Sequence, residues 1–303
     1  MSPESTLSIG ELAERAGVTV KTVRFYSDRG LLPEAGRSTG GHRRYAPEAL
    51  GRLRLIRSLR TLDLPVPEVG RVLDREGALE DVIAGQLKEL GSQLAALRWR
   101  EAALQLLRDC TAEERVDRLR LIGAVATPPS TAPMVRFWRQ VLPARLPARL
   151  FSSIVEAAVP QPPADPTPAQ VLAFARLHAL TSEARLGHCR PESHCQGKDP
   201  AVLYDGLAEA YGLAAPDLRA RARPYEGEAL DCFVAAHARF HRTRDTPAFR
   251  SRLSGLLAQS ADSVMDGYWQ LGAELSTSAE PTLGATDDWL RAALDSQVDQ
   301  AAR

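Results

Sequence analysis

Residues 8 to 29 carry the pattern that most constrains the fold, because they predict two short helices joined by a tight turn. Ser8 and Glu11 have the spacing of a capping box, in which a hydroxyl and a carboxylate satisfy the first amides of a helix. Apolar residues then recur at the spacing of one helix face, Gly17 can end that helix, and Thr19 can cap the next. This is the pattern of a helix-turn-helix, whose second helix enters the major groove of DNA.

The second helix is expected to begin at Val20 and to have two different faces. At about 100° per residue, Val20 and Val23 share one side, and Phe25 lies nearly opposite, flanked by Lys21 and Thr22. We expect the valines to hold the helix to its own domain. Lys21 and Thr22 would then face the groove, and Phe25 would either share that role or pack.

The next segment, residues 32 to 50, combines three glycines with basic and aromatic side chains. Glycine supports positive-φ turns, so a short hairpin is expected here. Such a wing can lie along DNA phosphates, which Arg donors contact without reading sequence. A basic surface loop is the alternative. The candidate wing residues are Arg37, His42, Arg43, Arg44 and Tyr45.

Residues 7 to 45, LSIGELAERAGVTVKTVRFYSDRGLLPEAGRSTGGHRRY, resemble the N-terminal domain of MerR-family transcription regulators. The resemblance continues through residues 53 to 73, LRLIRSLRTLDLPVPEVGRVL, which correspond to the family's second helix pair. It implies a winged helix-turn-helix DNA-binding domain over residues 1 to 76. It also implies that the wing residues contact DNA, together with residues of the recognition helix or its phosphate contacts, namely Thr19, Lys21, Thr22, Arg24 and Tyr26.

Charge is distributed unevenly along the 303 residues. The net charge is zero, yet residues 1 to 60 hold eleven Lys or Arg against six Asp or Glu. This asymmetry favours a part that faces nucleic acid and a neutral to acidic remainder. No apolar run approaches the roughly 18 residues of a membrane span, and no signal-like segment opens the chain, so we expect a cytoplasmic protein without a membrane partner.

Residues 77 to 126 are expected to form a long helix and a short one. Apolar residues alternate three and four apart, the spacing of a coiled-coil seam, with Glu101 interrupting one position. An amphipathic helix packed within its own chain is the alternative. The resemblance implies an antiparallel coiled coil in a homodimer, which distorts promoters with an overlong spacer for RNA polymerase in response to an effector. The expected dimerisation residues are Ile83, Leu87, Leu90, Leu94, Leu97 and Leu104.

Beyond a proline-rich linker at residues 127 to 133, the sequence predicts an all-α domain over residues 134 to 303. No phosphate-binding loop, dinucleotide fingerprint or hydrolase motif occurs there, so we expect neither an enzyme nor a cofactor. The expected helices cover residues 134–142, 145–158, 168–186, 199–212, 228–243, 247–275 and 286–301.

Cysteine and histidine concentrate in two places of this domain, residues 188 to 195 and residues 232 to 241. A metal or thiol-redox sensor is therefore one alternative function, with candidate ligands Cys189, Cys195, Cys232, His237 and His241. The spacing matches no standard zinc module. Metal-sensing members of the family carry a cysteine at the start of the dimer helix, which is absent here, and Cys110 could match only part of such a site.

Residues 157 to 180 and 244 to 269 resemble segments of the antibiotic-binding effector domains of thiostrepton-inducible regulators. The shared features are a proline-rich loop before a histidine-containing helix, and a turn before a final amphipathic helix. The resemblance implies a drug-like or natural-product ligand bound in an apolar cleft. A sequestering resistance protein that controls its own promoter is a further alternative. The candidate ligand-binding residues are Phe174, His178, Tyr204, Tyr211, Phe233, Tyr268 and Trp269.

Overall fold

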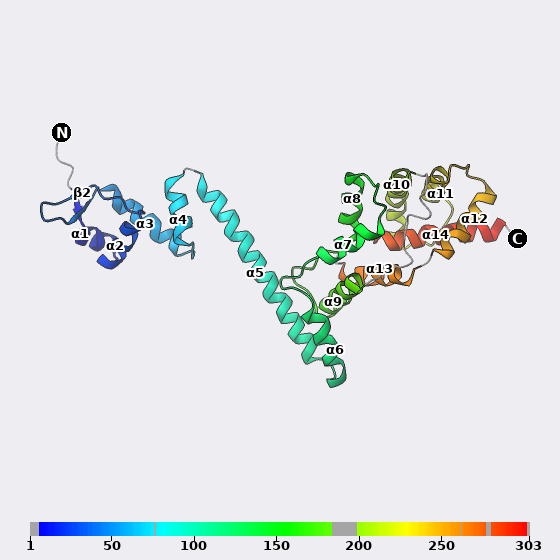
Figure 1. Cartoon of the computed structure of the whole chain (residues 1–303), viewed down its shortest axis with the longest axis horizontal. Helices are drawn as coiled ribbons and strands as arrows, with labels where there is room; N and C mark the ends of the chain where they lie inside the picture. Colours follow the sequence, from blue (N-terminus) through cyan, green and yellow to red (C-terminus); the bar gives the residue numbers. More distant parts are fainter. Residues whose placement is uncertain (1–5, 76, 184–198, 261, 277–279, 302–303) are drawn as a thin grey trace. The chain divides into compact units, whose positions relative to one another are not determined.

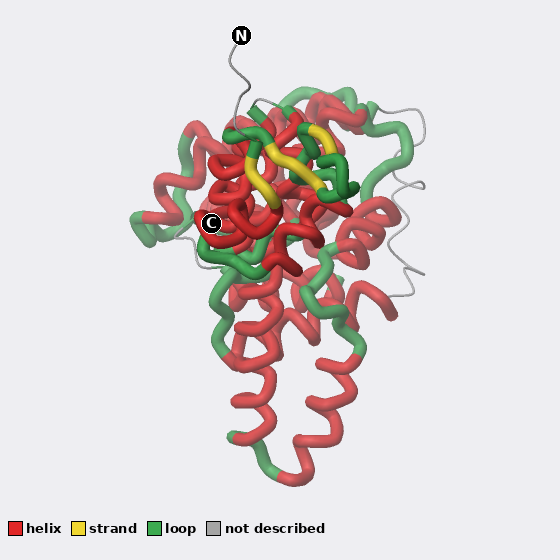
Figure 2. Tube along the Cα trace, turned by 90° about the vertical axis from the view of Figure 1, so that its left-hand side faces the viewer, coloured by secondary structure: helices red, strands yellow, loops and turns green. Residues whose placement is uncertain are grey.

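The computed structural model describes residues 6–75, 77–183, 199–260, 262–276 and 280–301 of the chain. These residues are mainly helical, as the sequence predicts, and Figure 2 shows the few short strands lying side by side. The chain forms two compact units, Met1–Ser92 and Gln93–Arg303. The units divide within the long helix α5 (Ala78–Arg108), which is one continuous helix in Figure 1.

The first unit begins with a helix-turn-helix whose capping residues are those expected from the sequence. The Ser8 hydroxyl accepts from the Glu11 amide at 3.2 Å, and the Glu11 carboxylate accepts from the Ser8 amide at 2.7 Å. Gly17 ends the first helix with a φ of 64°, which glycine adopts without strain. The Thr19 hydroxyl caps the second helix. The elements of this unit before α5 are β1 (Leu7–Ser8), α1 (Ile9–Ala16), α2 (Val20–Asp28), β2 (Gly36–Arg37), β3 (Arg43–Tyr45), α3 (Glu48–Arg60) and α4 (Val66–Asp74).

The expected wing is a hairpin of β2 and β3, and it belongs to a small antiparallel sheet in the order β1-β3-β2. Leu7 pairs with Tyr45, and Gly36 pairs with Arg44. This register places β1 beside the exit of the wing. The tip turns at Gly41, which has a φ of 77°.

A single apolar core joins the helices of the first unit to this sheet. Leu12 of α1, Val23 of α2, Tyr45 of β3, Ile56 of α3 and Val69 of α4 are all fully buried in it. Burying one such aliphatic side chain contributes about 1.5–3 kcal/mol. Because α2 packs on α1 and α1 packs on α3, this core fixes the orientation of α2 within the unit.

The second unit is all-α in its described part, again as expected. Its core has two clusters of buried side chains. One lies among the C-terminal half of α5, α7, α9 and α13, and the other among α10, α11, α12 and α14. The helices that follow α5 are α6 (Ala112–Gly123), α7 (Ala132–Val141), α8 (Ala148–Ala158), α9 (Pro168–Glu183), α10 (Pro200–Arg219), α11 (Glu228–Phe240), α12 (Pro247–Gln259), α13 (Ser263–Leu275) and α14 (Leu283–Ala301).

Two of the expected helix boundaries in this unit were wrong. The single helix expected over residues 247–275 is two helices, because the Asp262 carboxylate accepts from the Val264 amide at 2.8 Å and starts α13 anew. The helix expected over residues 199–212 continues to Arg219 and contains Pro216. In the part of the chain that the structure describes, no helix is both long enough and apolar enough to cross a membrane.

Candidate functional site

The exposed face of α2 carries cations and an aromatic ring. Lys21, Arg24 and Arg29 are exposed, and so is Phe25. The Arg29 guanidinium lies 4.5 Å from the centre of the Phe25 ring, within the range of a cation–π interaction. Phe25 therefore lies on the same outer surface as the cations, and it does not pack against the second helix pair.

The opposite face of α2 differs from the expectation at two positions. Val23 is fully buried as expected, but Val20, the first residue of the helix, is 39% exposed at its N-terminal end. Tyr26, expected among the DNA-contacting residues, is buried in the core. It lies three residues after Val23 and so follows the buried side of the helix. Thr22, half-buried, shares a hydrogen bond of 2.9 Å with the Thr19 hydroxyl.

The wing residues divide into an exposed set and an internal set. Arg37 and His42 are exposed near the tip, and Arg44 is half-buried on β3. Tyr45 is fully buried and belongs to the core, so its aromatic ring packs within the unit. The exposed and half-exposed cations are those that can reach a phosphate.

Arg43 links the wing to the end of α2. Its Nη1 lies 2.6 Å from Asp28 Oδ1, and its Nε lies 2.8 Å from Glu34 Oε1. The ion pair with Asp28 also raises the pKa of the Arg43 guanidinium. The Arg43 guanidinium is thus already paired with two carboxylates. These ion pairs connect β3 to the end of α2 and so position the wing.

The six expected dimerisation residues form an exposed apolar stripe along α5. They are between 41% and 64% exposed, namely Ile83, Leu87, Leu90, Leu94, Leu97 and Leu104. Other α5 side chains, including Trp99 and Leu106, are buried in the core of the second unit. The internal packing of the chain therefore uses the other side of the helix and leaves the stripe in solvent.

The second unit contains a cavity of about 490 Å³ between α7, α8, α10, α11, α13 and α14. Four aromatic side chains contribute to its wall, namely Trp138, Tyr204, Tyr211 and Trp269. Leucine, isoleucine and methionine side chains add to the apolar wall. A cavity of this size, apolar with a few polar groups, has the character of a small-molecule site.

Hydrogen bonds fix the position of Trp138, one of the aromatic residues that line the cavity. The Trp138 Nε1 donates to the Tyr268 hydroxyl at 2.9 Å, and that hydroxyl donates to the Ala158 carbonyl at 2.8 Å. Burial raises the pKa of Tyr268 to about 12, so it remains a neutral donor. Trp138 and Trp269 lie with ring centres 5.5 Å apart. The buried Tyr268 thus fixes Trp138, and Trp138 in turn contacts Trp269.

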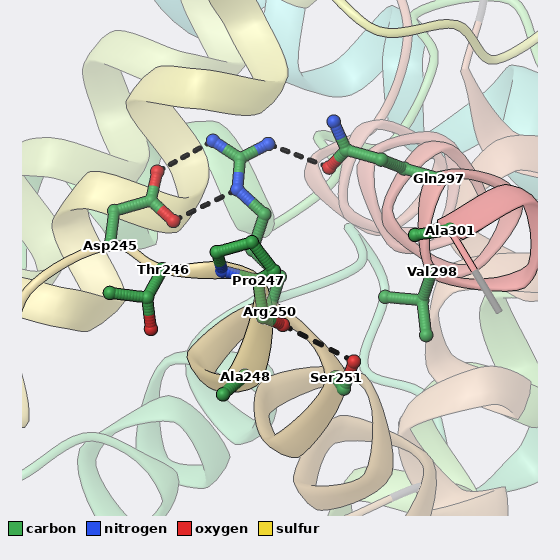
Figure 3. A pocket seen from close by; sticks show the side chains of 9 residues that line it. All are labelled: Asp245, Thr246, Pro247, Ala248, Arg250, Ser251, Gln297, Val298 and Ala301. Atoms are coloured by element: carbon green, nitrogen blue, oxygen red, sulfur yellow. Dashed lines mark hydrogen bonds and ion pairs between the residues drawn. The ribbon is translucent and has the colours of Figure 1, made fainter.

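A second cavity, of about 560 Å³, lies between the start of α12 and the end of α14 (Figure 3). Its polar centre is Arg250, which Figure 3 shows between Asp245 and Gln297. Arg250 Nε lies 2.9 Å from Asp245 Oδ1, and its Nη1 lies 2.6 Å from Gln297 Oε1. Arg250 also pairs with Asp231 at 2.7 Å. These groups satisfy one another, which is the arrangement of a structural tie.

The sequence matches the family model described as MerR HTH family regulatory protein over residues 7–76. A ZntR homolog of Haemophilus influenzae, an HTH-type transcriptional regulator, is 32% identical over 123 residues, which are 38% of this chain and 91% of that protein. The chain belongs to the MerR family of HTH regulatory proteins.

Two further relatives match this chain over only part of their own length. The nodulation protein NolA of Bradyrhizobium sp. is 37% identical over 112 residues, which are 37% of this chain and 47% of NolA. The HTH-type transcriptional activator TipA of Streptomyces coelicolor is 34% identical over 118 residues, which are 36% of this chain and 47% of TipA. The chain thus spans about half the length of these two relatives.

Within the MerR-family chain, the structure brings together only some of the expected ligand-binding residues. Tyr204, Tyr211 and Trp269 line the cavity. Phe174, Phe233 and Tyr268 are fully buried core residues, and His178 does not line the cavity. The sequence could not distinguish the aromatic residues that line the cavity from those buried in the core, because aromatic residues occur in both places. The charged lining residues that the sequence interpretation missed are Asp262, Asp266, Asp287, Asp288 and Arg291.

The candidate metal ligands do not gather in the part of the MerR-family chain that is described. Cys189 and Cys195 lie outside the described residues. The Cys232 thiol lies 3.7 Å from the Gly206 carbonyl oxygen, and burial raises its pKa. Among the described residues, no three His, Cys, Asp or Glu side chains are grouped closely enough to hold a metal ion.

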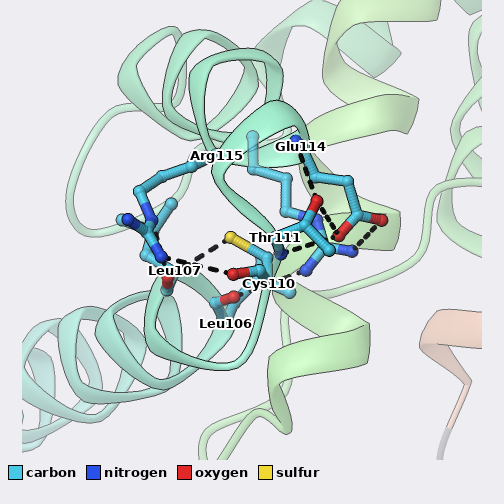
Figure 4. A network of polar contacts seen from close by, with 7 residues as sticks. Leu106, Leu107, Cys110, Thr111, Glu114 and Arg115 are labelled. Atoms are coloured by element: carbon cyan, nitrogen blue, oxygen red, sulfur yellow. Dashed lines mark hydrogen bonds and ion pairs between the residues drawn. The ribbon is translucent and has the colours of Figure 1, made fainter.

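Cys110 lies between α5 and α6 in a network of local hydrogen bonds (Figure 4). Its thiol donates to the Leu107 carbonyl at 3.2 Å. Arg115 donates to that carbonyl and to the Cys110 carbonyl, both at 3.3 Å. Next to it, Thr111 and Glu114 form the capping box of α6. These local hydrogen bonds hold Cys110 and its carbonyl at the junction of α5 and α6.

Proposed function

We propose that this protein is a dimeric transcription regulator that binds promoter DNA through α2 and the wing, and binds a small drug-like or natural-product effector in its second unit. Membership of the MerR family is the observation that carries the proposal. The resemblance to thiostrepton-inducible regulators, supported by TipA among the relatives, favours a drug-like effector.

The exposed cations support the DNA-binding part of the proposal. Lys21 and Arg24 on α2, Arg29 directly after it, and Arg37 and Arg44 on the wing belong to one small domain with one apolar core. Arg and Lys donors are suited to phosphate oxygens and to guanine edges. In addition, the N-terminus of α2 offers a positive helix dipole at Thr19.

The exposed stripe on α5 supports the dimer. Burial of that stripe against a second copy would bring two α2 helices to a DNA site with two-fold symmetry. In the mechanism that the family resemblance implies, the effector favours a dimer conformation that bends and untwists an overlong spacer, and RNA polymerase then uses the promoter. The energy for this deformation would come from protein–DNA contacts.

The test is a gel shift with an operator selected by the full chain from a random duplex library. We expect Lys21→Ala with Arg24→Ala to weaken binding about tenfold or more and to make it less dependent on salt, because each lost phosphate contact lowers the salt slope by about 1. Arg239→Ala, which removes an exposed cation from α11 in the second unit, is the control. If both variants behave like the unmodified protein, α2 is not the DNA-binding element.

A further inference from the structure

The polar residues of the 490 Å³ cavity carry an unbalanced negative charge. Asp262, Asp266, Asp287 and Asp288 line it, whereas Arg291 is the cation among its described lining residues. Arg291 is already engaged, because its Nε lies 2.6 Å from Asp287 Oδ2 and its Nη1 donates to the Leu257 carbonyl at 3.3 Å. The cavity therefore has more anionic groups than its own cation can compensate.

Two of these carboxylates are available to a ligand. Asp287 also accepts from the Tyr211 hydroxyl at 2.8 Å, so its oxygens are in use. By contrast, the side chains of Asp266 and Asp288 form no hydrogen bond or ion pair with any described residue. Asp288 is exposed, yet partial desolvation and the neighbouring Asp287 raise its pKa against the opposing attraction of Arg291. A nearby cation would relieve this cost.

A third polar group lines the same cavity and is uncharged. His237 on α11 is only 8% exposed, and its imidazole donates to no described residue and accepts from none. Its visible partner is the Phe233 ring, at 4.8 Å between ring centres. Burial, with repulsion from His241 and Arg291, lowers the pKa of His237 to about 4. It therefore offers a hydrogen-bonding group to the cavity and no positive charge at neutral pH.

We propose that this cavity binds a ligand in which a cationic group is attached to an aromatic or apolar body. The inference rests on the proposed function, in which the second unit receives an effector, and it names the chemical class of that effector. The cation lies near Asp266 and Asp288, and the apolar body lies against Trp138 and Trp269. The face of an aromatic ring attracts both cations and apolar groups. The aromatic residues and the carboxylates of the cavity therefore favour the same kind of ligand.

The same residues disfavour an anionic ligand. An anion would meet two carboxylates that form no ion pair with a described residue, while Arg291, the cation among the described lining residues, already pairs with Asp287. A neutral apolar ligand would leave the carboxylates partly desolvated and unpaired, which costs free energy. The charge of the ligand thus decides between a cationic, an anionic and a neutral ligand, whereas the shape and apolar surface of the cavity would suit all three.

The experiment uses two probes of matched size and opposite charge, tetraphenylphosphonium and tetraphenylborate. Each is titrated calorimetrically into the full chain in sodium buffer without DNA. We expect tetraphenylphosphonium to bind about tenfold or more tightly than tetraphenylborate. The double variant Asp266→Asn with Asp288→Asn should lose about tenfold in affinity for the cation, because Asn keeps the side-chain size and removes the charge.

The matched control is Glu274→Gln with Asp299→Asn. These exposed acids lie on α13 and α14, the same two helices, but do not line the cavity. The control removes as much charge from the chain, so it should leave cation binding within about twofold of the unmodified protein. Circular dichroism of each variant verifies that it folds.

Three results would overturn the inference. They are equal or tighter binding of tetraphenylborate, unchanged cation affinity in the Asp266 and Asp288 variant, and absence of binding by either probe. Operator binding is measured separately by gel shift on the same preparations. A failure confined to calorimetry refutes the ligand class, whereas loss of operator binding by the unmodified protein refutes the regulator role itself.

Discussion

Among single residues, Arg43 shows how a cation in a segment proposed to bind DNA can have an internal role. The sequence places it in a basic wing, where a phosphate contact is the natural interpretation. The structure pairs it with Asp28 at 2.6 Å and with Glu34 at 2.8 Å, so its charge is largely neutralised within the unit. Arg43 thus serves the interface by holding β3 against the end of α2.

Arg43→Ala tests this role. We expect operator affinity to fall about threefold to tenfold, because the wing loses its tie, while the salt slope stays unchanged, because no phosphate contact is removed. The loss of stability should be small, as for a partly exposed ion pair. Arg37→Ala, at an exposed position on β2, is the comparison. A salt slope lowered by about 1 in Arg43→Ala would show instead that Arg43 contacts phosphate directly.

His237 makes stability depend on pH. Its pKa is about 4 in the folded chain, below the ordinary value of 6.5 for histidine, so the unfolded chain binds more protons between these values. The free energy of unfolding should therefore fall as pH drops from about 6.5 to 4, by up to about 3 kcal/mol. Urea unfolding at pH 7 and pH 5 measures this. His237→Gln should reduce the difference between the two pH values, and an unchanged difference would rule out His237 as its source.

At the scale of elements, the contact of α13 with α14 shapes the cavity wall. Gly284 has no side chain, and a Cβ at this position would lie 2.2 Å from the Trp269 ring. The ring can occupy its place in the wall only because glycine stands opposite. Sequence patterns show a glycine near the start of a helix, but they do not show which ring lies against it.

Gly284→Ala should therefore displace Trp269. We expect a loss of about 1–3 kcal/mol in the free energy of unfolding and weaker binding of tetraphenylphosphonium, because overpacking forces the ring out of its position. Gly255→Ala on α12 is the matched control, since a Cβ there meets no atom within 4 Å. It should be neutral or slightly stabilising. Equal effects of the two substitutions would contradict the role of Gly284.

At the scale of the whole molecule, we propose that the exposed apolar stripe on α5 packs against a second copy of the chain. Leu90→Asp with Leu97→Asp should produce monomers in sedimentation and should weaken operator binding strongly, because the two recognition helices are no longer linked. Leu256→Asp, at an exposed position on α12, is the control and should remain a dimer. A dimer that survives the α5 substitutions would place the interface elsewhere.

The sequence alone determined the local and periodic features of this protein. Capping residues, the left-handed Gly17 and the apolar spacing of α5 depend on contacts within a few residues, so the helix-turn-helix, the wing and the exposed stripe could be predicted. Family motifs added the fold of the first unit. Such features are readable because their physical causes lie close together in the chain.

Only the tertiary structure decided which residues of a given type face solvent, core or cavity. Tyr26 and Tyr45 are core residues although they stand within DNA-contacting motifs, and Val20 is exposed although it shares a helix face with Val23. Likewise, Asp266 and Asp288 reach one cavity with His237 from three different helices. The reason is physical, since burial and electrostatic environment depend on partners that are distant in sequence and meet only when the helices pack.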